Sequence, residues 1–478
     1  MVKNETSFAV DVLLSVCRDG GGRLGDQLED QLRRAIRGGT LKPGTRLPST
    51  RDLARQLGVS RNIAVDAYAQ VAAEGYLQLR QNARPRVSDA VARIPATRVE
   101  EPPRPPGPRF DFRPSRPDVS TFPRGAWLRS LRRALATMTN ADFTLSDPRG
   151  VDALRAELTD YLGRVRGVVA EAARVVVTCG YSQGLGLVCH ALKTRGAKRI
   201  AFEDPGNPEQ HEIAARAGLD AVAIAVDGDG IRVDLLERSG ADAVAVTPAH
   251  QDPTGVVLSS ERRTALAGWL RAKQAIAIED DYDAEYRYDR AAVGALQGLA
   301  PDRVVYCGSA SKILAPALRL GWLVVPSTLV AAVSREKSLT DRSTAHVEQF
   351  AFADLVQRGE LDRYLRRMRI SYRARRDLMI EALADELPAA TVTGIAAGLH
   401  LNVHLPRAVD EAALLAECER RRIVFSTFAR EYRSRTRGAI LMLGYAQTHE
   451  SAIAAGIHEL ATAVRAARTT RGPRRHPR

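Results

Sequence analysis

The first periodic stretch of the chain predicts a small helical domain. An apolar residue recurs at every fourth position and forms one stripe along a helix, at Leu24, Leu28, Leu32 and Ile36. Ser49 stands at the start of a second helix and Ser60 at the start of a third, which runs to Glu74, because a hydroxyl before such a segment is a typical N-cap. Residues 76–79 and 86–87 then predict the two strands of a hairpin.

Beyond residue 117 the pattern changes to short apolar runs that alternate with helical stretches. Seven runs are predicted as strands, at 174–178, 199–203, 221–226, 243–247, 275–279, 304–308 and 320–325. Such alternation predicts an α/β fold in which a mainly parallel sheet is covered by helices on both faces. From about residue 327 the chain is helix-rich and ends in a smaller α+β segment.

A proline-rich segment separates these two parts. Prolines and arginines crowd between residues 90 and 117, and proline lacks the amide donor that a helix or sheet needs, so we expect a semi-extended linker. An ordered loop packed on the next domain is the alternative for the part after Phe110. The predicted organisation is a helical head, a linker, a large domain and a basic tail, at 21–89, 90–117, 118–467 and 468–478.

Composition and charge narrow the functional classes. The 478-residue chain has a net charge of +14, and much of the excess lies near its two ends. We count 12 Lys and Arg against 6 Asp and Glu between Arg23 and Arg86, and six Arg with no acid from Arg465 to Arg478. This pattern fits a nucleic-acid backbone, although a solvated basic surface is the alternative. Five scattered cysteines argue against a disulfide framework or zinc site, and no signal or membrane-spanning pattern is found, which predicts a cytoplasmic protein without membrane contact.

The second and third predicted helices have the spacing of a helix-turn-helix. The third would enter the major groove, and its first turn carries Ser60, Arg61 and Asn62, which can meet phosphates and base edges. A helix pair alone is a weak signal for DNA binding. The segments GTLKPGTRLPSTRDLA (39–54), LGVSRN (57–62) and AEGYL (73–77), however, resemble the GntR-type winged helix almost throughout.

This resemblance implies binding to a double-stranded DNA operator. It places Ser49, Arg51, Ser60 and Arg61 at the contact. The wing departs from the glycine-rich tip that is usual in the family, because this chain has RQNARPR at 80–86. Arg84 and Arg86 can still meet phosphate.

A lysine with an unusual context marks the large domain. Lys312 lies in CGSASKILAPALRLGW (307–322), after a predicted strand and between small hydroxyl residues in an apolar stretch. Burial there would lower the pKa of its amine and favour the neutral, nucleophilic form. Ser309, Ser311 and Arg319 can bind a phosphate. The spacing S-x-S-K, with an arginine seven positions on, is similar to that of fold-type I pyridoxal-phosphate enzymes.

Two further segments supply the other groups that such a cofactor needs. In AIAIEDDYDAEY (275–286) a predicted strand ends in carboxylates, and the D-x-Y spacing assigns Asp280 to the pyridine nitrogen and Tyr282 to the ring hydroxyl. In VVVTCGYSQGL (175–185) a strand, a glycine turn and a helix start place Gly180, Tyr181 and Ser182 where free amides can cradle a phosphate.

Together, residues 110–467 resemble the aminotransferase-like domain of MocR-type regulators, in which such a domain follows a GntR-type head. The resemblance implies pyridoxal 5'-phosphate as cofactor and a homodimer arranged head-to-tail. True aminotransferases carry Asn where this chain has Asp252, and the family's usual aromatic or His near the ring is replaced by Asn207. The arginine that clamps a substrate carboxylate is missing near its expected place, Ala439. Its neighbouring candidates are Arg430, Arg435 and Arg437.

These patterns predict a transcription regulator whose cofactor domain senses a small molecule and adjusts operator affinity. Two alternatives are a working aminotransferase with an accessory DNA-binding head, and a regulator whose large domain is an inert dimer scaffold. The resemblance also leaves two kinds of effector: pyridoxal phosphate itself, with control of its synthesis, or an amino compound. Residues 293–303 are most similar to regulators of pyridoxal-phosphate synthesis, which favours the first kind.

Overall fold

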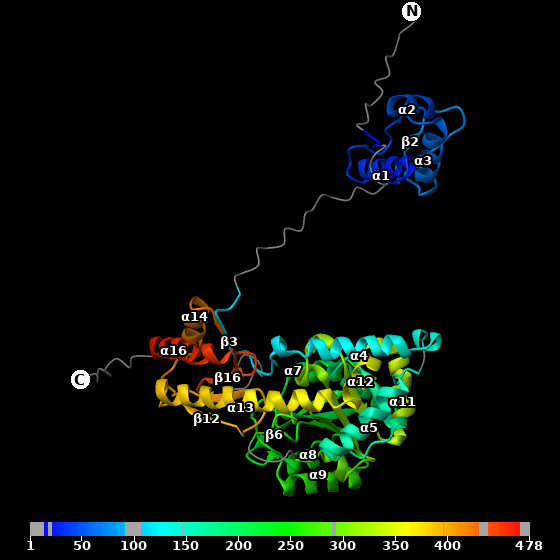
Figure 1. Cartoon of the computed structure of the whole chain (residues 1–478). Helices are drawn as coiled ribbons and strands as arrows, with labels where there is room; N and C mark the ends of the chain where they lie inside the picture. Colours follow the sequence, from blue (N-terminus) through cyan, green and yellow to red (C-terminus); the bar gives the residue numbers. More distant parts are fainter. Residues whose placement is uncertain are drawn as a thin grey trace, which may run out of the picture. The chain divides into compact units, whose positions relative to one another are not determined.

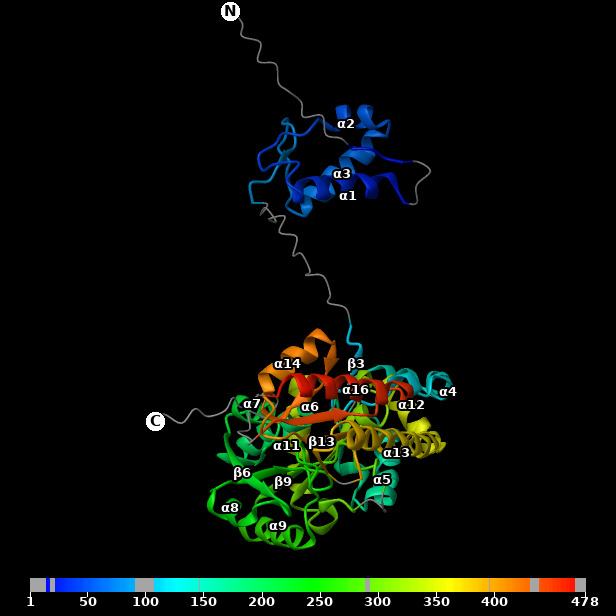
Figure 2. The same cartoon turned by 90° about the vertical axis from the view of Figure 1, so that its left-hand side faces the viewer.

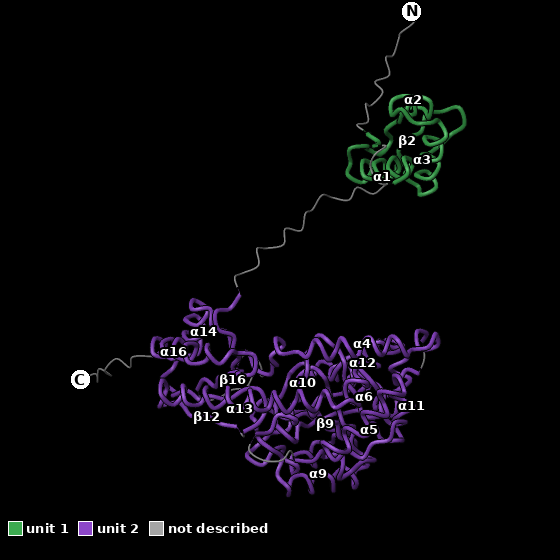
Figure 3. Tube along the Cα trace, in the orientation of Figure 1, with its two compact units in different colours: residues 1–105 green, residues 106–478 purple. Residues whose placement is uncertain are grey.

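The chain divides into two compact units, Met1–Pro105 and Pro106–Arg478 (Figure 3). The computed structural model describes residues 14–17, 22–90, 107–145, 147–288, 293–394, 396–429 and 438–468. The basic tail after residue 468 and most of the predicted linker therefore lie outside the described residues.

Unit 1 is a three-helix domain with a short hairpin (Figures 1 and 2). Its elements are α1 (Leu24–Arg37), α2 (Thr50–Leu57), α3 (Arg61–Ala73), β1 (Leu77–Gln78) and β2 (Arg86–Val87). The predicted apolar stripe is the buried face of α1, and it packs with Ala64, Tyr68 and Val71 of α3. The winged helix-turn-helix predicted from the sequence is confirmed.

Unit 2 is built on an eight-stranded sheet. Its strands are β4 (Val175–Thr178), β5 (Arg199–Asp204), β6 (Asp220–Asp227), β7 (Gly230–Ile231), β8 (Ala243–Val246), β9 (Ile276–Asp280), β10 (Val304–Ser309) and β11 (Gly321–Val324). The strand order is β4-β11-β10-β9-β8-β5-β6-β7. Neighbours from β10 to β6 are parallel, whereas β11 runs antiparallel to both β4 and β10. The mainly parallel α/β fold is confirmed, and all seven predicted strands are present.

Helices cover both faces of this sheet. They are α4 (Arg124–Thr137), α5 (Asp152–Arg166), α6 (Tyr181–Thr194), α7 (Pro208–Arg216), α8 (Val233–Arg238), α9 (Ser260–Lys273), α10 (Ala310–Ile313), α11 (Ser327–Thr340), α12 (His346–Gln357) and α13 (Glu360–Glu386). Side chains alternate along β4, so Val176 belongs to the apolar cluster that holds α6 and α11, while Val175 and Val177 belong to the cluster that holds α5 and α12. Apolar burial on both faces is typical of an α/β fold.

A smaller sheet forms the C-terminal part of unit 2, at one end of the unit in Figure 1. It contains β12 (Thr391–Thr393), β13 (His400–His404), β15 (Ser426–Thr427) and β16 (Ile440–Gly444), in the order β12-β13-β16-β15. Two helices, α14 (Glu411–Arg420) and α16 (Glu450–Ala466), contact each other beside it. This is the α+β segment that the sequence predicts.

Residues 107–117, placed in the linker by their proline content, pack within unit 2. Strand β3 (Phe110–Asp111) pairs in parallel with β14 (Ile423–Val424), and Phe112 is fully buried. Apolar burial of Phe110 and Phe112 holds this extended segment on unit 2. Among the described residues, no helix has both the length and the apolar character needed to cross a membrane.

Candidate functional site

A cavity of about 720 Å³ lies in unit 2, at the ends of β9, β10 and β4. The nine cofactor-binding candidates from the sequence all line it: Gly180, Tyr181, Ser182, Asp280, Tyr282, Ser309, Ser311, Lys312 and Arg319. They come from three segments that are far apart in the chain. The carboxyl ends of parallel strands meet at one edge of a sheet, which is where ligands bind in open α/β folds.

The turn between β4 and α6 forms one side of this cavity. Gly180 has a φ of 116° and precedes α6 without any side chain capping the helix. A Cβ atom added to Gly180 would lie 3.5 Å from an Nη atom of Arg319, so the guanidinium closes directly over the turn. Free amides of a helix start beside an arginine form a site for an anion.

The serine pair and Lys312 form the second side. Ser309 ends β10, and its Oγ accepts the Ser311 amide N–H at 3.1 Å and donates to the Ser311 hydroxyl at 2.9 Å. Lys312 Nζ donates to the carbonyl oxygen of Ser115 at 2.7 Å. Burial lowers the pKa of Lys312, although Asp252 and other nearby carboxylates act in the opposite direction. Its amine is therefore more readily neutral than that of an ordinary lysine.

The carboxylate side of the cavity begins at the last residue of β9. Burial raises the pKa of Asp280 well above its ordinary value, with Asp252 and Asp281 adding to the effect and Lys312 opposing it. A cation placed against Asp280 would restore the ionised form. The Tyr282 hydroxyl lies 3.2 Å from His250 Nδ1, and the same nitrogen lies 2.9 Å from an oxygen of Asp283.

His250 is a residue to which the sequence patterns assign no role. Burial by itself lowers the pKa of its ring, but the charge and hydrogen bond of Asp283 outweigh burial, and the pKa of His250 is raised. A carboxylate partner of this kind orients the imidazole ring and, through it, the Tyr282 hydroxyl. The sequence could have marked His250 as a site residue, because it lies two residues before Asp252 in TPAHQDPTG (247–255).

Beyond the nine candidates, the residues that line the cavity carry no cofactor assignment from the sequence. They are Arg113, Pro114, Ser115 and Arg116 from the segment after β3, Asn207, Glu209 and Gln210 around the start of α7, Asp252, and Ser426 of β15. Asn207 caps α7 by accepting the Glu209 amide N–H at 2.9 Å. Tyr181 and Tyr282 are the aromatic side chains in this lining, within the part of the chain that the structure describes. Neither stands at the place of Asn207, where the family usually carries an aromatic residue or a His.

The candidates for a substrate carboxylate clamp lie outside the described residues. Arg430, Arg435 and Arg437 fall in the segment 430–437. Ala439, the place where the sequence leads one to expect the clamp, is buried, and its carbonyl accepts the Leu405 amide N–H.

In unit 1 the predicted DNA-binding residues lie at the starts of two helices. Arg51 is exposed in the first turn of α2, and Arg61 and Asn62 are exposed in the first turn of α3. Ser49 and Ser60 are the N-caps of these helices, with Ser49 Oγ accepting the Asp52 amide N–H at 3.2 Å. The hydroxyls therefore stabilise the helix starts from which the basic side chains project.

The wing of unit 1 carries further positive charge. Arg46, Arg80, Arg84 and Arg86 line a groove of about 300 Å³ beside the hairpin. Arg86 also has a structural role, because its Nε donates to the carbonyl of Gly44 at 3.1 Å and it forms an ion pair with Asp89 at 3.3 Å. The wing thus presents a basic surface without a glycine-rich tip.

Comparison with known proteins identifies both units. Residues 24–87 match the bacterial regulatory proteins of the gntR family, and residues 118–433 match aminotransferase class I and II. The chain is 34% identical to the HTH-type pyridoxine biosynthesis transcriptional regulator PdxR of Corynebacterium glutamicum, over 78% of this chain and 82% of that protein. It is 31% identical to the probable rhizopine catabolism regulatory protein MocR of Rhizobium meliloti, over 94% and 96% of the two chains. The chain belongs to the MocR-type regulators.

Solved structures give the same fold for the large domain of this MocR-type regulator. An archaeal alanine:glyoxylate aminotransferase matches with a TM-score of 0.67 and 24% identity, over 74% of this chain and 90% of that one. The α-aminoadipate aminotransferase LysN of Thermus thermophilus matches with a TM-score of 0.66 and 23% identity, over 74% and 92%. The protein is thus a DNA-binding transcription regulator with an aminotransferase-like domain, a fold family that depends on pyridoxal phosphate.

Proposed function

We propose that this regulator binds pyridoxal 5'-phosphate in the 720 Å³ cavity, with Lys312 as the attachment residue, and that the bound state changes its affinity for operator DNA. The observation that supports this most is the meeting, in one cavity, of nine candidate residues from three distant segments. An inert scaffold has no need of a buried amine, a buried acid and an anion site side by side.

The residues fit the chemistry of the cofactor. Gly180 and the amides of Tyr181 and Ser182 at the start of α6, with Ser309, Ser311 and Arg319, would hold the phosphate. Asp280 would keep the pyridine nitrogen protonated, and Tyr282 would donate to the ring oxygen. The neutral form of the Lys312 amine is the nucleophile that an aldehyde requires. Pyridoxal phosphate, when bound, supplies that aldehyde and an electron-withdrawing ring.

The fit rests on the shape of the site as well as on its charges. Gly180 takes a left-handed φ of 116°, which any residue with a Cβ adopts only with strain. Its neighbour in the next strand, Gly321, is equally restricted, because a Cβ there would lie 2.8 Å from the Gly180 Cα. Two glycines thus bring backbone, amides and Arg319 together around a space for a small anion.

We infer further that the effector is pyridoxal phosphate and that the regulated genes serve its synthesis. The support is the relative that regulates pyridoxine biosynthesis, which is 34% identical over 378 residues. Asp252, in place of an asparagine, and the absence of an arginine at Ala439 argue against efficient amino transfer. A homodimer arranged head-to-tail is part of the same proposal, since two-fold symmetry matches paired operator half-sites.

Operator binding should depend on the cofactor. Protein freed of cofactor and protein loaded with pyridoxal phosphate are expected to differ in operator affinity by about 5- to 150-fold, the range of typical coupling energies. The measurement is a titration of an operator fragment, selected from random DNA by the full-length chain, followed by fluorescence anisotropy. Amino transfer from a panel of amino acids is assayed in parallel and is expected to be negligible. Robust multiple turnover together with equal operator affinity would favour the aminotransferase alternative.

Gly180→Ala is expected to weaken binding of pyridoxal phosphate by about tenfold. The added Cβ strains a backbone at φ 116° by ~1–3 kcal/mol and moves the amides that face the phosphate. Equilibrium dialysis measures the affinity. Gly186→Ala, within the helix α6 that follows Gly180, serves as the matched control and should bind normally, because the nearest contact of the added Cβ is a side-chain carbon 3.7 Å away. If both variants bind pyridoxal phosphate with equal affinity, the turn at Gly180 is not part of the phosphate site.

A further inference from the structure

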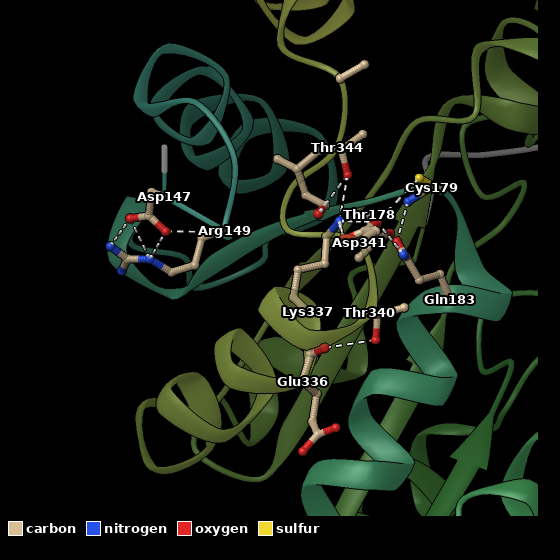
Figure 4. A network of polar contacts seen from close by, with 12 residues as sticks. Asp147, Arg149, Thr178, Cys179, Gln183, Glu336, Lys337, Thr340, Asp341 and Thr344 are labelled. Atoms are coloured by element: carbon tan, nitrogen blue, oxygen red, sulfur yellow. Dashed lines mark hydrogen bonds and ion pairs between the residues drawn. The ribbon is translucent and has the colours of Figure 1, made fainter. Parts of the chain in front are cut away.

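A fully buried lysine, Lys337, lies close to Thr178 and Cys179, just before the turn between β4 and α6 (Figure 4), and it is not among the residues that line the cavity. The side chain of Lys337, in the last turn of α11, is 0% exposed. Its Nζ donates to the two carboxylate oxygens of Asp341 at 2.6 and 2.7 Å, and to the hydroxyl of Thr344 at 3.0 Å. Its ammonium therefore has three acceptors, which satisfies all three of its protons.

Gln183 connects this ion pair to the turn between β4 and α6. Its Nε2 donates to Asp341 at 2.6 Å, and its Oε1 accepts the Cys179 amide N–H at 2.8 Å. Thr344 in turn donates its hydroxyl proton to the carbonyl of Val177 at 3.3 Å. The backbone is thus held on both sides of Thr178, immediately before Gly180.

The chemistry of Asp341 fixes the orientation of the Gln183 amide. An ionised carboxylate only accepts hydrogen bonds, so the NH₂ side of Gln183 must face Asp341 and its carbonyl oxygen must face Cys179. Lys337 holds the Asp341 side chain in place, because its Nζ donates to both carboxylate oxygens. Without Lys337, the Asp341 carboxylate and the Gln183 amide can rotate, and the Cys179 amide then loses its partner.

We propose that Lys337, Asp341 and Gln183 are positioning residues that hold the β4–α6 turn in the conformation that binds the cofactor phosphate. This inference rests on the proposed function, because it assumes that the turn binds that phosphate. The three side chains act through the backbone of Cys179, next to Gly180, and are not among the residues that line the cavity. Their effect is therefore specific to the phosphate end of the ligand.

Pyridoxal, which lacks the phosphate, separates this role from a general structural one. In Lys337→Met the affinity for pyridoxal phosphate should fall by about tenfold, the usual loss when one good hydrogen-bonding group is misplaced, while the affinity for pyridoxal stays unchanged. Both affinities are measured by the absorbance change of the full-length protein on titration. A purely structural role would lower both affinities together or neither.

Gln183→Leu provides a second test in case Lys337→Met does not fold. This change removes the Gln183 hydrogen bonds to Asp341 and Cys179 while leaving the buried Lys337–Asp341 pair intact. As in Lys337→Met, the ratio of the affinity for pyridoxal phosphate to the affinity for pyridoxal should fall. Arg174→Met is the control, because the Arg174 side chain is also buried but donates to the carbonyls of Val325 and Pro301, at the other end of β4. It should leave the ratio at the wild-type value.

The outcomes distinguish this inference from the proposed function. If the wild-type protein binds pyridoxal phosphate but both variants keep the wild-type ratio, or lose both ligands equally, the positioning role is wrong. If the wild-type protein does not bind pyridoxal phosphate at all, the proposed function fails first. A selective loss of the phosphorylated ligand in either folded variant, with the control unchanged, supports the inference.

Discussion

Lys312→Ala is expected to abolish covalent attachment of pyridoxal phosphate while leaving the protein folded. Lys312 lies among Ser309, Ser311 and Asp280 at the edge of the main sheet, and burial lowers the pKa of its amine. No other lysine lines the cavity, within the part of the chain that the structure describes. Reduction with borohydride followed by mass spectrometry of the intact protein and its peptides should find the cofactor on Lys312 in the wild type and on no residue of the variant.

The control for this experiment is an exposed lysine of the same unit. Lys193, near the end of α6, is exposed and lies outside the cavity lining, so Lys193→Ala should keep the full adduct. Circular dichroism and thermal unfolding test whether both variants are folded. We expect that they are, because within the described part of the chain Lys312 donates one hydrogen bond, to the Ser115 carbonyl. Retention of the adduct in Lys312→Ala, or its appearance on another lysine of the wild type, would show that the attachment residue is misassigned.

The parts of the fold and site that could be predicted are those set by local sequence. Strands of β-branched residues that end in Asp280, Ser309 and Thr178 predict both the sheet and the edge at which polar groups gather. The caps Ser49 and Ser60 follow from the same local chemistry, because a hydroxyl satisfies the amides of a helix start.

The parts that could not be predicted depend on contacts between distant segments. Ser115 has a φ of 57°, unusual for a residue with a Cβ, and it reaches Lys312 because β3 joins β14 and brings the following residues over the cavity. Proline content alone favours a linker there. Lys337 is similar: a Lys and an Asp four residues apart normally indicate an exposed pair, and its burial follows from the packing of α11 on α6.

Under the proposed function, the aminotransferase-like fold would serve regulation in place of catalysis. Holding and protonating a cofactor needs the lysine, the acid and the anion site, all of which this chain has. Amino transfer also needs a substrate held with its reacting bond in line with the ring, and lost positioning forfeits much of the rate. Asp252 lies in the cavity where an asparagine is found in true aminotransferases. Binding free energy can then be used to favour one state of the regulator.

Arg61→Ala is expected to weaken binding to the operator much more than binding to random DNA. Arg61 is the first residue of α3 and is exposed, and Ser60 fixes the start of that helix. A helix that enters the major groove N-terminus first brings this guanidinium to base edges, where a good bidentate contact contributes roughly 1–3 kcal/mol, or about 5- to 150-fold in affinity. Anisotropy titrations with operator and scrambled DNA at one salt concentration measure both affinities.

The matched control is Arg34→Ala, which removes an exposed arginine from α1 in the same domain. It changes the net charge by the same amount, so any general electrostatic loss appears in both variants. For Arg61→Ala the ratio of operator to random-DNA affinity should fall, whereas for Arg34→Ala it should stay constant. Arg61→Ala could instead lose equal affinity for both DNAs, with a salt dependence reduced by about one phosphate contact. Arg61 would then contact the DNA backbone, and another residue of α3 would read the base sequence.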